Sequence, residues 1–574
     1  MSASLRVAYE WKDLPWKKFH KQTFKLQKRI YRASQSGNMK LVRSLQKLLI
    51  KSQAAAHLAV RRVSQDNQGK KTAGVDGVKE LTPSQRIKLT QEIKAKPYIK
   101  KAKAVRRVWI PKAGKKDEKR PLGIPTMEER ARQALIKLAL EPEWEAKFEP
   151  NSYGFRPGRS AQDAISYIFL SIRESPKYVL DTDIAKCFDK INHKTLLEKL
   201  NTYPQMQRTI KAWLKAGILD GKELFPSEEG TPQGGVISPL LMNVALHGME
   251  TFISNSFPIS KGIKAEKKIT LNWRPQVIRY ADDAVILHSD PGVIEQTKVL
   301  LEEWLKPLGL ELKEEKTRIS HTYWYGNETP GFDFLGFNVR QYKVGKTHKP
   351  KSKYYRLNYT TRIRPSKKSL KNQSQKLNDT IKKMRTSTQR ELIRTLNPII
   401  SGWGRYYGIS DSKSKGKNDH QMLFPALARW ARRRHPSKNW GWVVRKYWRL
   451  ETGKWDFATK DGIRLQSHYQ KIERLLPVGK RSPYDGDWAY WLMRTKQHPD
   501  LSPTKARLLK RQKGKCAYCK LQFQLGDLLE TDHVIPKERG GLNVLLNLQL
   551  LHRHCHDSKT SQDECNIGGI FDND

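Results

Sequence analysis

The sequence predicts a multidomain α+β protein, and three observations support that class. Its 574 residues are enough for three or more domains, each with a sizeable core. Short apolar runs, partly β-branched and bounded by polar residues, predict a strand-rich region over residues 178–340. Helical spacing of apolar residues predicts helices before this region, over residues 17–65, and after it, around residues 392–400.

The amino-terminal part combines predicted helices with a strongly basic segment. Residues 17–65 carry basic residues between apolar ones and no proline, and residues 70–74 end that pattern. Residues 94–120 then hold twelve Lys or Arg and only two acids, with Trp109 and Ile110 among them. Such a segment suits a surface that follows a phosphate backbone, and a basic loop without a partner is the alternative.

The central region holds an acidic pair, Asp282 and Asp283, between two short apolar runs. That pattern predicts a β-hairpin with both carboxylates at its tip, and a strand over residues 178–183 ends in a third, Asp183. Adjacent buried aspartates are costly unless cations neutralise them. Three aspartates on two neighbouring strands would hold a pair of Mg²⁺ ions about 3.5–4 Å apart, an arrangement used in phosphoryl transfer. Taken alone, the acidic pair would also fit a solvated turn.

Residues 341–450 are the most basic part of the chain. They hold 29 Lys or Arg against four acids, with aromatic residues such as Trp403 and Trp430 interleaved. Helices of this composition could pack their apolar faces together and present cations to folded RNA, with some rings stacking on unpaired bases. Many of these rings would instead belong to the core. The polar residues 411–417 predict an exposed loop.

Two Cys/His pairs lie in the last 60 residues, where four of the five cysteines are found. Cys516 and Cys519 form a CxxC pair, and His552 and Cys555 repeat its spacing. Three thiolates and one imidazole are an established set for tetrahedral structural Zn²⁺, so metal binding is favoured over a disulfide framework. The rivals for the fourth ligand position are His554 and Cys565.

Charge and hydropathy limit the function classes of the whole chain. Its 109 Lys and Arg against 57 Asp and Glu give a net charge of +52, typical of a protein that binds a polyanion with salt-dependent affinity. No run of 18 apolar residues and no signal-peptide core appear, so no membrane partner is expected. Together with the cysteine pattern, this predicts a soluble protein of a reducing intracellular compartment.

Nearly the whole chain resembles one family, the reverse transcriptases encoded by mobile group II introns, which are maturases with a carboxy-terminal HNH endonuclease. The resemblance rests on many short motifs in a fixed order, which are very hard to obtain by chance. They lie at residues 72–77, 110–112, 120–126, 152–160, 183–189, 230–239, 282–283, 309–312, 316–317, 334–337, 401–407, 530–536 and 547–556.

The resemblance implies a right-hand polymerase fold and four successive units. Fingers and palm would occupy residues 1–340, an α-helical thumb or X domain residues 341–450, and a DNA-binding segment residues 451–503. Residues 504–574 would form a small zinc-containing HNH domain of the ββα-metal type.

In the palm, the resemblance makes Asp183, Asp282 and Asp283 the catalytic ligands of two Mg²⁺ ions. Metals held there would lower the pKa of a primer 3′-hydroxyl and stabilise charge on the leaving pyrophosphate. Asp181 is a rival for the first position, but Asp183 has the family's spacing to Phe188.

Four further residues would bind the incoming dNTP. Phe188 would lie beneath its sugar, where the ring collides with a 2′-hydroxyl, although an ordinary core phenylalanine is the alternative. Gln233 and Gly234 would let the backbone approach the template–nucleotide pair, because glycine has no Cβ. Lys316 could protonate pyrophosphate or merely pair with phosphate.

In the carboxy-terminal domain, the resemblance gives His533, Asn547 and His556 the catalytic roles of an HNH nuclease. His533 would activate water, while Asp532 and His556 hold one divalent ion, Mg²⁺ or Mn²⁺, at the scissile phosphate. Asn547 would brace the loop that orients the base. A zinc ribbon that binds nucleic acid without cutting it is the alternative.

The resemblance therefore implies three activities: an RNA-directed DNA polymerase, a splicing maturase that binds its own intron RNA, and a DNA endonuclease. The nuclease would cut the second strand of double-stranded target DNA for target-primed reverse transcription in retrohoming, in a bacterial cytoplasm. A maturase that only binds RNA is one alternative, and the intact catalytic set argues against it. A retron or phage-defence reverse transcriptase is another, which would not be expected to join a basic thumb to an HNH unit.

Overall fold

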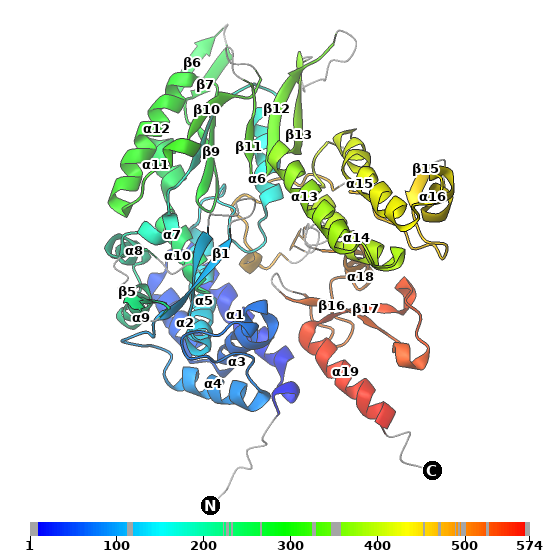
Figure 1. Ribbon diagram of the computed structural model, residues 1–574. Helices are drawn as coiled ribbons and strands as arrows, with labels where there is room; N and C mark the ends of the chain where they lie inside the picture. The colour runs from blue at the N-terminus through cyan, green and yellow to red at the C-terminus, as the bar shows by residue number, and fades with distance from the viewer. Residues whose placement is uncertain are drawn as a thin grey trace, which may run out of the picture.

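The computed structural model describes most of the chain, and Figure 1 shows its course from the amino-terminal helices to the carboxy-terminal domain. The described residues are 10–111, 119–221, 223–225, 229–230, 234–264, 267–323, 329–345, 357–411, 413–451, 454–468, 472–487, 490–491, 494, 501–523 and 527–568. Within these ranges no helix is both long enough and apolar enough to cross a membrane.

The amino-terminal part is a layer of helices. α1 (Trp16–Gln35), α2 (Met39–Lys51) and α3 (Gln53–Arg61) pack on α5 (Met127–Lys147), and α4 (Pro83–Ala95) packs on α3. Asn38 and Ser52 accept hydrogen bonds from backbone N–H groups at the start of α2 and α3, which fixes where each helix begins. The helices predicted over residues 17–65 are confirmed, with short breaks between them.

Two four-stranded sheets follow. The first has the order β2-β1-β4-β5 and is formed by Lys119–Ile124, Val105–Pro111, Ile218–Asp220 and Glu223–Phe225. The second, the central sheet, is antiparallel with the order β10-β3-β9-β8 and is formed by Arg318–His321, Tyr178–Asp183, Asp283–His288 and Gln276–Tyr280. The strands predicted around the acidic residues are confirmed.

Both faces of the central sheet are covered. Alternate residues of each strand point to opposite sides, and each set packs in its own buried cluster. Leu180 and Ile286 belong to the same buried cluster as α12 (Pro291–Leu305). Val179 and Val285 share a second cluster with α6 (Ala161–Ile172). The sheet is therefore fixed by packing from both sides, and its strand ends are held in place.

The other elements of this region surround the central sheet. The helices are α7 (Cys187–Lys190), α8 (His193–Leu200), α9 (Pro204–Leu214), α10 (Ser238–Ala245) and α11 (Met249–Asn255). The strands form a hairpin, β6 (Ile259–Lys264) with β7 (Lys267–Asn272), and a sheet of β11 (Phe332–Phe334), β12 (Phe337–Lys343) and β13 (Tyr359–Pro365).

A helical region then leads to a short hairpin. It contains α13 (Lys367–Lys383), α14 (Gln389–Tyr406), α15 (Lys413–Arg434) and α16 (Trp440–Tyr447), followed by β14 (Trp448–Glu451) and β15 (Lys454–Phe457). The loop predicted at residues 411–417 is wrong from Lys413 onward, because α15 begins there. The buried Leu423, Leu427 and Trp430 later in α15 pack into the core of this region, and that packing outweighs the weak helix propensity of its first turn.

The carboxy-terminal domain comprises α18 (Pro503–Arg511), β16 (Leu529–His533), β17 (Leu548–His552) and α19 (Arg553–Gly568). It docks on the amino-terminal helices: Gln65 Nε2 donates to Asp557 Oδ2 at 2.8 Å. The ring of His20 stacks on that of His554, with centroids 5.5 Å apart, and burial lowers the pKa of His20 to about 4. The first and last parts of the described chain are thus in direct contact.

Candidate active sites

The central hairpin brings the three predicted carboxylates together. Ala281 and Asp282 join β8 to β9, and Ala281 takes the left-handed φ of 61° that allows so tight a turn. Asp183, at the end of β3, pairs with Asp283, at the start of β9. The backbone N–H of Ile184 donates to Asp282 O at 3.2 Å and ties the end of β3 to the turn.

These carboxylates repel one another as like charges, and the repulsion is strong because they are largely removed from water. Burial, followed by the charges of Asp282 and Asp183, raises the pKa of Asp283 to about 7. Burial and the charge of Asp183 also raise the pKa of Asp282. Lys316 offsets part of this repulsion through an ion pair with Asp183. A cluster whose ionised form is so unfavourable alone is chemically suited to divalent cations.

Asp181, the rival ligand, lies two residues before Asp183 on β3. It stands opposite Val285 of β9 and Arg318 of β10, one step inside the sheet from the turn. Burial and the charge of Asp283 raise its pKa to about 7 as well. Its electrostatic environment is therefore similar, but it does not stand at the strand ends.

A buried arginine that the sequence did not single out holds the hairpin turn. Arg279 on β8 donates to Ala281 O and Asn243 Oδ1, both at 3.1 Å, and to Ser152 Oγ at 2.8 Å. Asn243 donates in turn to Gly154 O at 2.8 Å. Gly154 lies so close to the turn that a Cβ would stand 2.4 Å from Ala281 N. The sequence offered one signal for this network, namely the charged residue Arg279 within a mostly apolar strand.

A cleft of about 1570 Å³ opens beside the hairpin, and Asp183, Asp282 and Phe188 line it. Its other lining residues include the cations Arg107, Lys119, Arg120, Lys186, Lys211 and Lys316. Gly234 has a φ of 114°, and a Cβ on it would stand 2.5 Å from Gly123 O, so this close approach requires glycine. Gln233 lies outside the described residues.

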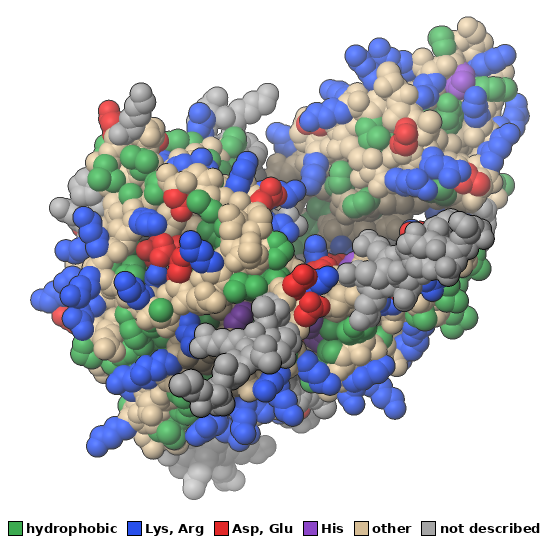
Figure 2. All heavy atoms as spheres, turned by 90° about the horizontal axis from the view of Figure 1, so that it is seen from below, with side chains coloured by type: hydrophobic (Ala, Val, Ile, Leu, Met, Phe, Trp, Pro, Cys, Tyr) green, Lys and Arg blue, Asp and Glu red, His purple; other side chains and the backbone are tan. Residues whose placement is uncertain are grey.

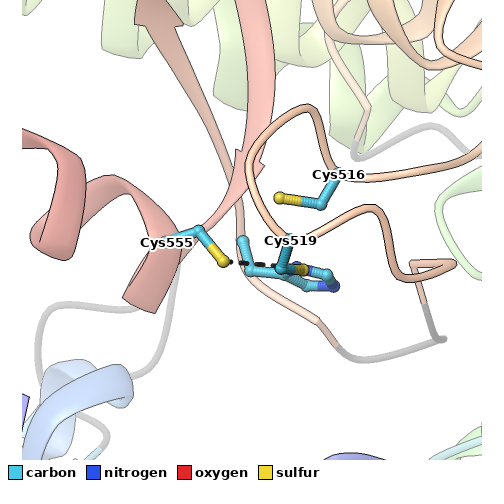
Figure 3. Close-up of side chains that lie close together, drawn as sticks. Cys516, Cys519 and Cys555 are labelled. Atoms are coloured by element: carbon cyan, nitrogen blue, oxygen red, sulfur yellow. Dashed lines mark hydrogen bonds between the residues drawn. The ribbon is translucent and has the colours of Figure 1, made fainter. Parts of the chain in front are cut away.

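The four predicted zinc ligands come together in the carboxy-terminal domain. The ligand atoms of Cys516, Cys519, His552 and Cys555 all lie within 4.8 Å of one another. Figure 3 shows the three thiols turned toward a common point, two from the loop after α18 and one from the start of α19. Three sulfurs and one ring nitrogen this close together fit a tetrahedral metal site.

His552 has a partner on each side of its ring. Nδ1 faces the thiols, 3.4 Å from Cys519 Sγ, while Nε2 lies 3.3 Å from Asp527 Oδ2. A carboxylate behind a ligating histidine fixes the ring and its tautomer. Asp527 was missed because nothing in its spacing marks it. His554, the rival ligand, instead stacks on His20.

β16, β17 and α19 form a ββα unit that presents the residues expected of a nuclease. Asp532 and His533 end β16, and His556 lies in the first turn of α19. His556 Nε2 is 3.9 Å from Asp532 Oδ1, a span that one divalent ion with bonds of about 2.1 Å would bridge. His533 Nε2 is buried and has no hydrogen-bond partner among the described residues.

Two further side chains fix the geometry of this unit. Asn547 accepts from Ile535 N at 2.9 Å and donates to Ile535 O and Leu542 O at 3.1 and 3.0 Å, which ties the loop after His533 together. Lys559, which the sequence did not single out, lies 3.1 Å from Asp532 Oδ2 and donates to His533 O at 3.0 Å. It therefore positions the strand end that carries both residues.

Four parts of the chain match models of known protein families. A family model for the N-terminal domain of reverse transcriptase matches residues 11–93, and one for reverse transcriptase (RNA-dependent DNA polymerase) matches residues 110–339. A group II intron, maturase-specific domain matches residues 370–448, and an HNH endonuclease matches residues 516–562. These matches cover the central sheet, the basic helical region and the ββα unit.

Three relatives are each similar to a large part of the chain. Protein YkfC of Escherichia coli (strain K12) is 31% identical over 309 residues, covering 48% of this chain and 78% of that protein. The group II intron-encoded protein LtrA of Lactococcus lactis subsp. cremoris is 30% identical over 335 residues, 49% of this chain and 54% of LtrA. Maturase-like protein 1 of Euglena gracilis is 26% identical over 411 residues, 70% of this chain and 78% of that protein. The aligned part thus spans about half the length of LtrA.

Proposed function

Because the chain belongs to the family of group II intron-encoded proteins, with reverse transcriptase, maturase and HNH endonuclease domains, we propose that it copies RNA into DNA, assists the splicing of its own intron RNA and cuts double-stranded DNA. Together these activities would serve retrohoming by target-primed reverse transcription. The observation that carries the proposal is the meeting of Asp183, Asp282 and Asp283 beside a cationic cleft.

In the palm, Asp183, Asp282 and Asp283 would hold two Mg²⁺ ions, which supply the positive charge that phosphoryl transfer requires. Phe188 would lie under the sugar of the incoming dNTP, and its place in the cleft wall supports this role. Lys316, already paired with Asp183, would contact the phosphates, and Gln233 with Gly234 would lie against the template–nucleotide pair.

In the carboxy-terminal domain, His533 would take a proton from the attacking water, and its unpartnered buried Nε2 supports this role. Asp532 and His556 would hold one Mg²⁺ or Mn²⁺ ion, and Asn547 would keep the loop after His533 in place. Zn²⁺ held by the Cys516–Cys519–His552–Cys555 set would have a structural role only, since four protein ligands leave no open position.

Binding of intron RNA is assigned to the thumb, proposed as residues 341–450, between the fingers and palm at 1–340 and the DNA-binding segment at 451–503. Its helices carry many cations, and Figure 2 shows Lys and Arg side chains spread widely over one face of the molecule, with acidic side chains only in small groups. The nuclease unit would occupy residues 504–574. Cysteines that hold Zn²⁺ as thiolates would need a reducing compartment, which we propose to be the bacterial cytoplasm.

Two variants of the full-length protein with its co-purified RNA separate the proposed activities. Asp282→Ala should lose primer extension on an RNA template but keep RNA splicing, because the cationic RNA-binding surface is untouched. His533→Ala should lose cleavage of the second DNA strand but keep primer extension. Sequencing of the co-purified RNA should give one intron-like species. Wild-type extension by Asp282→Ala, or equal loss of all activities in both variants, would contradict the proposal.

A further inference from the structure

The loop between β16 and β17, residues 534–546 and called here the apolar loop, turns an unusual set of side chains to solvent. Leu546 is 86% exposed and Leu542 is 69% exposed, so each leaves most of its apolar surface in water. The exposed aliphatic residues of the loop are Val534, Ile535, Leu542, Val544, Leu545 and Leu546. A contiguous exposed apolar patch marks an interaction site, whereas single exposed residues do not.

The backbone of the apolar loop is held rigidly, so these side chains are presented in fixed positions. Asn547 makes three hydrogen bonds across the loop, to Ile535 and Leu542. Gly541 lies so close to the opposite side of the loop that a Cβ would stand 2.0 Å from Ile535 O. Arg511 of α18 donates to Leu545 O at 2.8 Å. The apolar side chains are therefore exposed on a loop whose backbone is well anchored.

The position and charge of the loop favour duplex DNA as its partner. The apolar loop begins directly after His533 and ends directly before Asn547, and Val534 N donates to Asn547 O at 2.8 Å, so the base of the loop lies beside the proposed cleavage site. Lys537 and Arg539 are exposed in one short 3-10 turn of the loop, on either side of the exposed Glu538, which suits contact with the phosphates of one strand beside the apolar residues. Proteins that distort DNA insert Leu, Ile or other apolar side chains between base steps in the minor groove.

We infer that Leu546 and Leu542 insert into the minor groove of the target duplex and unstack the base step beside the bond that is cut. The inference rests on the proposed DNA cleavage by the HNH domain. Lys537 and Arg539 would hold the phosphates of one strand while the wedge bends the duplex, which turns the scissile phosphate toward His533.

The full-length protein with its co-purified RNA tests this on a duplex that the wild type cuts. Leu542→Ser with Leu546→Ser should slow second-strand cutting by roughly tenfold or more, with unchanged zinc content and primer extension. Leu48→Ser, which removes an exposed leucine from α2, is the matched control and should cut normally. With Ca²⁺ in place of Mg²⁺ to prevent cutting, 2-aminopurine beside the cut should brighten with the wild type but not with the double variant.

A duplex with a mismatch at that base step decides between a wedge and another use of the loop. Because its step is already unstacked, the double variant should cut it at nearly the wild-type rate. An equal loss on the matched and mismatched duplexes, or wild-type cutting by the double variant, would overturn the inference. Altered sedimentation of the double variant with normal cutting would instead make the loop a protein interface. If the wild type cuts no DNA, the nuclease assignment itself fails.

Discussion

The hairpin centre and the Cys/His centre both gather metal-binding groups, but opposite forces hold them. Around Asp183, Asp282 and Asp283, two large apolar clusters cover both faces of the sheet, and the fold keeps mutually repelling carboxylates together. In the carboxy-terminal domain the buried core is small, and it includes two of the proposed ligands, Cys516 and Cys555. In the first case the fold positions the charges. In the carboxy-terminal domain, the bound ion would stabilise the folded structure.

Removal of the proposed zinc ion should have the largest effect, because structural zinc contributes on the order of 10 kcal/mol to the folding of small domains. His552→Ala should release the metal, expose backbone amides of residues 504–568 to hydrogen exchange and abolish DNA cutting, while primer extension survives. His552→Cys should retain the metal, because thiolate is an equally good ligand. Metal analysis of both variants is the measurement. Full zinc occupancy in His552→Ala would show that the fourth ligand is His554, Cys565 or water.

Loss of Arg279 should have the next largest effect, because it breaks the buried hydrogen-bond network that fixes the hairpin turn. Arg279→Met should destabilise the palm by about 3–5 kcal/mol, since Ala281 O, Asn243 Oδ1 and Ser152 Oγ would each lose a donor while they stay buried. It should also lower kcat for primer extension in the folded fraction, with little change in KM for dNTP. Arg130→Met, which removes a buried arginine bonded to backbone carbonyls away from the turn, is the control. An equal fall in kcat in both variants would leave Arg279 a purely structural role.

Relief of the carboxylate repulsion should have a smaller effect on the free energy of unfolding, and it should raise stability instead of lowering it. The folded-state pKa of Asp283, about 7, lies above its unfolded value, so its ionisation removes stability as pH rises from about 4 to 7. In magnesium-free buffer, Asp283→Asn should therefore match the wild type near pH 4 and exceed it by about 1–3 kcal/mol at pH 8. Hydrogen exchange of β3 and β9 measures the difference. Added Mg²⁺ should shrink it, and a constant difference across pH would argue against repulsion as the cause.

Removal of the Phe188 ring should have the smallest effect on stability and a specific effect on substrate choice. Phe188→Ala should lower the preference for dNTPs over rNTPs by about tenfold, because the ring no longer blocks a 2′-hydroxyl. Competition between dNTP and rNTP in primer extension gives the ratio. Phe257→Ala, a change in a fully packed core phenylalanine, should lower stability without changing that ratio. The reverse pattern would make Phe188 a core residue.

The sequence predicted best what short-range patterns determine. The hairpin at Asp282 and the Cys516–Cys519 and His552–Cys555 pairs follow from alternation and spacing within a few residues. Asp527 and Lys559 could not be recognised, because their roles depend on partners that only the folded chain brings near. Arg279 gave one signal, a charge inside a mostly apolar strand, but its partners Asn243 and Ser152 also become neighbours only in the fold. The start of α15 at Lys413 was missed for a related reason, since packing later in that helix decides where it forms.

The contact between the two ends of the chain has a consequence for synthesis. Gln65 and its partner Asp557 are 492 residues apart, so at about 5–20 residues per second the ribosome needs roughly 25–100 s to make the second after the first. Throughout that interval His20 on α1 lacks the ring of His554 that stacks on it in the finished protein. The amino-terminal helices can fold early, but this interface closes only after Asp557 has been made, and a chain that terminates before Asp557 would keep it open.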